Sequence, residues 1–100
     1  MVVVYRTPAD PQAFEKHYFG THVPLAKQLP GLRSYEVSRG PIAALASATD
    51  THFVATLTFD DMDALRRAFA SDLGQQCAAD RKILAADGDV QMFLFETVEA

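Results

Sequence analysis

The chain has 100 residues, nine Lys and Arg against thirteen Asp and Glu, and a formal net charge of −4. This length supports one hydrophobic core, and a hydrophobic fraction of 49% excludes a disordered protein. No basic cluster extends beyond Arg66-Arg67, so nucleic-acid binding is not predicted. A single cysteine, Cys77, excludes an internal disulfide, and no apolar run is long enough for a signal core or a membrane span. We therefore expect one cytoplasmic domain over residues 1–100, without membrane partners.

The first half of the chain predicts a strand, an interrupted helix and a second strand. Val2–Tyr5 is β-branched and aromatic, as strands are. Asp10-Pro11 is typical of a helix start, with a capping carboxylate before a proline that needs no donor. Pro24 also lacks an N–H, so we expect a kink or a restart of the helix near it. Gly31 suits a positive-φ helix terminator, and residues 32–39 are expected to form an edge strand.

The second half of the chain repeats this order. Thr51–Phe59 alternates apolar and polar residues, which predicts a strand with His52 on the face turned away from the core. Asp60 is expected to cap the helix that follows. Gly74 is expected to separate that helix from a shorter one over residues 75–86.

The final strand and the order of elements predict the architecture. Asp89–Val98 is apolar on both faces, and it completes a β-α-β-β-α-β order. This order is typical of a ferredoxin-like α+β sandwich, with a four-stranded antiparallel sheet and the helices on one face. The other face would expose a contiguous apolar patch, which monomers rarely do. We therefore expect a homodimer with its sheets face to face, and the apolar loop Ile42–Ala48 packed on the partner or over a pocket as a lid.

Several motifs of the chain resemble one family. They are His22-Val23-Pro24-Leu25 and Leu29-Pro30-Gly31-Leu32, followed by Phe59-Asp60 and Gly74-Gln75. Over almost its whole length the chain resembles the EthD family, named for ethyl tert-butyl ether degradation, within the dimeric α+β barrel superfamily. The resemblance implies a dimeric barrel, a small pocket between sheet and helices, and an association with a cytochrome P450 degradation system. Superfamily members include cofactor-free monooxygenases, lactone isomerases, polyketide cyclases and haem enzymes.

His22 and Tyr18 are the candidate catalytic residues. The imidazole of His22 titrates near neutral pH and can act as general acid or base, and Tyr18 lies one helical turn before it. Their alternative roles are structural, because His22 could bond to backbone groups freed by Pro24 and Tyr18 could be a core residue. The candidate pocket-lining residues are Tyr5, Phe14 and Tyr35.

The sequence predicts no metal and no cofactor. Its histidines lack carboxylates or cysteines at ligand spacing, and His17 and His22, five positions apart, would lie on different faces of a helix. A haem ligand signature and a phosphate-binding loop are also missing from the sequence. Arg81-Lys82 is interpreted as a solvated helix face, and Cys77 as a buried, inert thiol.

Two classes of function fit these residues. The first is the binding of a small, largely apolar organic molecule, with isomerase, cyclase or monooxygenase chemistry in catabolism through proton transfer by His22. The second is a non-catalytic carrier or accessory protein of an oxidation system, and a structural dimer without ligand is a further alternative. A cavity lined by His22 and Tyr18 would favour catalysis, a wholly apolar cavity would favour carriage, and a packed interior would favour the structural dimer.

Overall fold

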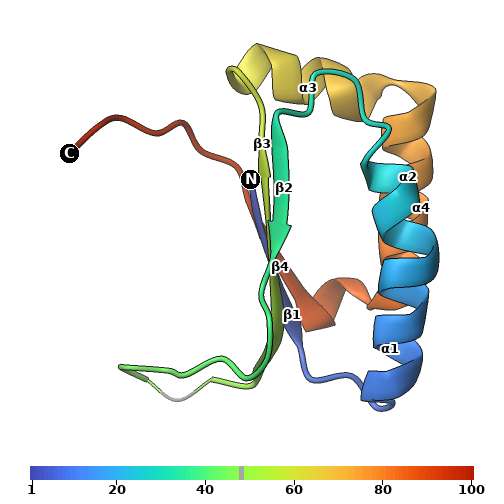
Figure 1. The fold of residues 1–100 in the computed structure, drawn as a ribbon, viewed down its shortest axis with the longest axis vertical. Coiled ribbons are helices and arrows are strands. Elements are labelled where there is room, and N and C mark those ends of the chain that lie inside the picture. Colours follow the sequence, from blue (N-terminus) through green and yellow to red (C-terminus); the bar gives the residue numbers. More distant parts are fainter. Residues whose placement is uncertain (48) are drawn as a thin grey trace.

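A computed structural model describes residues 1–47 and 49–100 of the chain. Four strands form one antiparallel sheet in the order β2-β3-β1-β4, and all four α-helices lie on one face of it (Figure 1). The strands are β1 (Val2–Arg6), β2 (Ser34–Val37), β3 (Thr51–Thr58) and β4 (Val90–Phe93). The helices are α1 (Pro11–His17), α2 (Val23–Ala26), α3 (Met62–Ala70) and α4 (Asp72–Leu84), with a π-helical turn η1 (Tyr18–His22) and a 3-10 turn η2 (Asp87–Asp89). This architecture confirms the predicted α+β sandwich.

Side-chain caps define the starts of α1 and α3, and one of the two predicted caps is wrong. Asp10 caps α1 as predicted, because its Oδ1 accepts a hydrogen bond from the Ala13 N–H at 3.1 Å. The predicted cap of α3 is wrong by one residue. Asp61, whose backbone is extended, accepts from the first turn of α3, whereas Asp60 forms an exposed ion pair with Arg33 at 2.8 Å.

Gly74 lies inside α4 and does not separate the two helices as predicted. Ser71 ends α3 and caps α4, accepting a hydrogen bond from the Gly74 N–H at 3.1 Å. A Cβ atom on Gly74 would lie 2.3 Å from the Ala68 carbonyl oxygen, so glycine permits the close approach of α4 to the end of α3. As a result α4 begins three residues before the predicted helix, at Asp72.

The last strand is shorter than predicted. The strand β4 ends at Phe93, which pairs with Val2 at the start of β1. Beyond Phe93 there is no further β1 residue to pair with, so residues 94–100 leave the sheet as an extended tail that runs away from the helices (Figure 1). Phe95 is half exposed and Val98 is 92% exposed.

The core lies between the sheet and the helices. Its most buried side chains are Val3, Tyr5, Phe14, Tyr18, Ala26, Leu29, Phe53, Ala55, Leu57 and Cys77. On the other face of the sheet, Val2, Val4 and Val54 are only partly buried and Phe93 is 48% exposed. The helices leave this apolar face uncovered, as the β-α-β-β-α-β order of the elements predicts.

The described residues of the connection between β2 and β3 extend from one end of the sheet, away from the helices (Figure 1). Leu45 at its tip is 99% exposed, and residues 43–47 do not line any cavity between sheet and helices. Residues 42–47 therefore form no lid over the cavity between sheet and helices, although Ile42 lines an open groove beside α1. Ala48 lies outside the described residues, and packing of the segment on a partner stays a prediction. Across residues 1–47 and 49–100, no helix is long and apolar enough to cross a membrane.

Candidate functional site

A π-helical turn positions the candidate residues. The Val23 N–H donates to the Tyr18 carbonyl, five residues back, where an α-helix would use a carbonyl four residues back. Pro24 has no N–H to continue the α-helical pattern, so α1 ends at His17 and the chain restarts as α2 at Val23. The predicted interruption at Pro24 is confirmed, and it takes the form of one extra residue in the turn.

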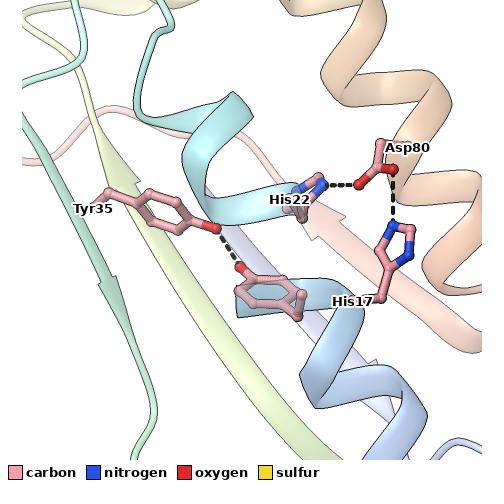
Figure 2. Close-up of polar contacts among 5 residues, drawn as sticks. His17, His22, Tyr35 and Asp80 are labelled. Carbon is pink, nitrogen blue, oxygen red and sulfur yellow. Dashed lines mark hydrogen bonds and ion pairs between the residues drawn. The ribbon is translucent and has the colours of Figure 1, made fainter. Parts of the chain in front are cut away.

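The extra residue brings His17 and His22 to one partner. In a regular α-helix they would lie about 140° apart, and the prediction that they occupy different faces is wrong because the π turn changes this angle. His17 Nε2 lies 2.8 Å from Asp80 Oδ1, and His22 Nδ1 lies 2.8 Å from Asp80 Oδ2 (Figure 2). Asp80 belongs to α4, far away in the sequence, and no local signal identified it.

The carboxylate defines how the two rings are protonated. Burial opposes the charged form of Asp80, but the hydrogen bonds from His17 and His22 outweigh burial and lower the pKa of Asp80. An ionised carboxylate only accepts hydrogen bonds, so His22 donates through Nδ1–H and His17 through Nε2–H. Burial lowers the pKa of His22 and outweighs the opposite effect of Asp80. Near pH 7, His22 is therefore neutral and its Nε2 carries a free lone pair.

His22 lines a cavity of about 120 Å³ between the sheet and the helices, which opens to solvent beside the exposed Lys82 and Met92. Apolar side chains such as Val3, Ala26, Ala55 and Leu57 form most of its walls. A cavity of about 150 Å³ is known to hold a benzene molecule, so this space suits a small organic molecule. Since Nδ1 is bonded to Asp80, Nε2 is the ring nitrogen that His22 has free for a molecule in the cavity.

Three tyrosines line the same cavity. The hydroxyls of Tyr18 on η1 and Tyr35 on β2 lie 2.5 Å apart, so one donates to the other (Figure 2). Burial raises the pKa of Tyr18, of Tyr35 and of Tyr5, and all three stay protonated at neutral pH. One hydrogen of the Tyr18–Tyr35 pair is used within the pair, and the other is available to a ligand. Phe14 is the remaining pocket candidate. Its ring packs edge-on against that of Tyr5, with 5.2 Å between the ring centroids, and it does not line the cavity.

The helix α4 contributes charge to this cavity. Arg81 is 9% exposed, and it donates to the Ala85 carbonyl at 2.8 Å and to Asp87 at 2.6 Å. The interpretation of Arg81 as solvated is therefore wrong, because its turn of α4 faces the cavity, whereas Lys82 is exposed at the cavity edge. Cys77 is buried on the same helix, and burial raises the pKa of its thiol.

A larger, open groove of about 1090 Å³ lies beside α1 and the start of β3. Its wall includes His52. The sequence predicted that His52 lies on the open side of the sheet, and this is wrong, because the ring faces the helices. The pairs Tyr5–Phe53 and Arg6–Thr51 leave His52 as the extra residue of a β-bulge, which turns its ring to within 5.7 Å of the Phe14 ring. The groove contains neither the His22–Asp80 pair nor the tyrosine pair, so the smaller cavity beside His22 is the better candidate site.

Metal binding has no structural support in the described residues. Within residues 1–47 and 49–100, no group of three His, Cys, Asp or Glu side chains could hold a metal ion. His17 and His22 are both bonded to Asp80 through one ring nitrogen each.

Comparisons with known proteins agree with the fold. Residues 6–88 match the family model of the EthD domain. The chain is 35% identical over 97 residues to an uncharacterized 11.0 kDa protein in the thcB-thcC intergenic region of Rhodococcus erythropolis, covering 96% of this chain and 92% of that protein. It also superimposes on the crystal structure of an ethyl tert-butyl ether (EthD) family protein from Bacillus halodurans, with a TM-score of 0.86 and 29% identity, over 97% of this chain and 95% of that one.

Proposed function

The chain belongs to the EthD family, and on that premise we propose that it binds a small, largely apolar organic molecule beside His22 and moves a proton to or from it. One observation carries the proposal. His22 is buried, its Nδ1 is held by Asp80, and the ring borders a cavity that contains a tyrosine hydroxyl pair. An oriented imidazole beside a mostly apolar cavity is an arrangement suited to general base catalysis.

The chemistry follows from the protonation states. The free lone pair of His22 Nε2 takes a proton from an acidic C–H or O–H bond of the ligand, and Asp80 stabilises the imidazolium that forms. A hydroxyl of the Tyr18–Tyr35 pair donates to the ligand oxygen on which negative charge develops. Return of the proton to another atom would complete an isomerisation or a cyclisation, and a carbanion formed in this way is also the starting point for cofactor-free oxygenation.

A second candidate function is carriage without catalysis. The walls of the cavity are mostly apolar, which favours retention of an apolar molecule whether or not it reacts. In this case the chain would be an accessory protein that holds or protects a ligand for an oxidation system, and His22 would only orient it.

We also propose that the protein is a homodimer. The open face of the sheet carries Val2, Val4, Val54 and Phe93, and no helix of the described chain covers them. A second copy of the same face would remove this apolar surface from water.

We propose that this dimer acts in the cytoplasm, where a free thiol such as Cys77 stays reduced.

Proton exchange on a small ketone tests the proposed function without knowledge of the natural substrate. Cyclopentanone fits the size of the cavity, and its α-hydrogens exchange with D₂O only after proton removal. We expect the protein to accelerate this exchange, and His22→Gln to reduce the acceleration by about 10²-fold or more. His52→Gln is the matched control, because His52 lies outside the cavity. Binding of cyclopentanone, seen as shifts of the Ala26 and Ala55 methyl resonances, without exchange would favour carriage. The absence of both would contradict the proposal.

A further inference from the structure

The polar groups that line the cavity are mostly cations and hydrogen-bond donors. Among the described residues that line it, Arg81 and Lys82 are cations, the tyrosines are hydrogen-bond donors, and none is Asp or Glu. Asp80, which holds the ring of His22, has both oxygens bonded to histidines. Asp87 pairs with the Arg81 guanidinium, but its side chain is 76% exposed and does not line the cavity. Electrostatically, the cavity is suited to a negatively charged group.

From this arrangement we propose that the ligand is a weak organic acid, an apolar body that carries one carboxyl, phenol or enol oxygen. The proposal deepens the proposed function and rests on it. A phenol or enol binds with its proton, so its O–H bond breaks and an N–H bond forms at His22 Nε2. A carboxylic acid is already ionised near pH 7, so its carboxylate binds together with a proton taken up from the solvent, which forms the same N–H bond. The imidazolium and the ligand oxyanion then face each other, with Arg81 and Lys82 on the α4 side.

A charged ligand beside His22 changes the balance that sets its protonation. Burial is the main cause of the lowered pKa of His22, the hydrogen bond to Asp80 and its charge oppose burial, and the nearby His17 and Arg81 lower the pKa further. An empty cavity therefore keeps His22 neutral. An oxyanion in the cavity offsets the effects of burial and of Arg81, because it is an opposite charge close to the ring and close to Arg81. A neutral amide cannot do this, and an ammonium group would add a like charge.

Three probes of similar size and different charge test the proposal, namely butyrate, butyramide and butylammonium. Binding is followed through the resonances of the cavity methyls of Ala26 and Ala55, and the ring nitrogens of His22 are followed by long-range ¹H–¹⁵N spectra. We expect butyrate to bind about tenfold tighter than butyramide, and butylammonium to bind more weakly than either. We also expect butyrate, and not butyramide, to shift His22 Nε2 toward the imidazolium position.

Two lysine variants test whether a cation at the cavity edge contributes to butyrate binding. Lys82 is exposed, so Lys82→Gln should weaken butyrate binding by only about 2- to 5-fold and leave butyramide binding unchanged. Lys16→Gln removes another exposed charge, on α1 and outside the cavity, and should change neither. Equal affinities for butyrate and butyramide would overturn the proposal and leave ligand binding in the cavity intact. A preference for butylammonium would also overturn it. If none of the probes shifts the cavity methyls, cavity binding fails and the proposal fails with it.

Discussion

His22 Nδ1 and Asp80 Oδ2 lie 2.8 Å apart, although 58 positions separate the two residues in the sequence. The contact joins the π-helical turn to the middle of α4 and buries both side chains. It also leaves one nitrogen of the imidazole free beside the cavity. This single contact therefore links the packing of the helix layer to the chemistry proposed for the site.

Asp80→Asn removes the charge and keeps the shape of the side chain. An amide has one acceptor oxygen, so it can satisfy only one of the two histidine N–H groups and faces the other with its own donors. We expect a loss of about 1–3 kcal/mol in the free energy of unfolding, measured in urea. Asp89→Asn is the control, because Asp89 is exposed, and it should be nearly neutral. An equal effect of the two substitutions would show that the Asp80 contacts contribute little to folding.

The free energy of unfolding should fall as the pH decreases below about 6.5, the ordinary pKa of histidine. Burial lowers the pKa of His22 in the folded protein, so at mildly acid pH the unfolded chain binds a proton that the folded chain does not. His22 contributes at most about 1.4 kcal/mol per pH unit to the slope of the free energy of unfolding against pH.

The lowered pKa of Asp80 adds a second loss of stability at lower pH, below its ordinary value of 3.8. Urea unfolding of the wild type and of His22→Gln from pH 7 to pH 5 should show the first loss in the wild type only, and parallel profiles would argue against a buried neutral His22.

Gly74→Ala and Gly20→Ala are a matched pair. A Cβ on Gly74 would meet the backbone of Ala68 and Phe69 at 2.3 to 2.4 Å, whereas a Cβ on Gly20 would have nothing within 4 Å. We expect Gly74→Ala to cost about 1–3 kcal/mol or more, because helix backbones cannot move apart without disturbing the core. Gly20→Ala should be neutral or stabilise the fold by up to about 1 kcal/mol. Thermal unfolding of both variants measures this difference, and similar melting temperatures would disprove the close helix approach.

The proposed dimer predicts opposite outcomes for two exposed apolar residues. Phe93 lies on the open face of the sheet and is 48% exposed, and Ile83 lies on α4 and is 73% exposed. Phe93→Asp should convert the dimer to an 11.0 kDa monomer in sedimentation at micromolar concentration. Ile83→Asp should leave the dimer intact, because the helices lie on the other side of the sheet. A wild-type protein that sediments as a monomer at this concentration would contradict the proposal.

The parts of the fold that local signals specify were predictable. Asp10 and Pro11 define the start of α1, and the alternation in residues 51–58 defines β3. Pro24 predicts the interruption of the helix because a missing N–H is a property of that residue alone. The end of β4 was not predictable from its own residues, since the apolar pattern continues to Val98 and the strand ends opposite Val2, where the antiparallel β1 begins.

The site was predictable only in part. His22, Tyr18, Tyr35 and Tyr5 meet at one cavity, and their residue types made them candidates. Asp80 was missed because its role depends on the packing of α4 against the π turn, which no short-range pattern encodes. Two insertions of a single residue, the π turn and the β-bulge, each rotated a histidine away from the face that regular periodicity predicts.

The long-range ¹H–¹⁵N spectrum of the histidine rings at pH 7 tests the central claim most directly. The account predicts that His22 is neutral, with its proton on Nδ1 and a bare Nε2, and that addition of cyclopentanone perturbs the Nε2 resonance. In the same spectrum His52, which lies outside the cavity, should not respond. A proton on Nε2, or an Nε2 resonance that does not respond to a probe bound in the cavity, would contradict the assignment of His22 as the base.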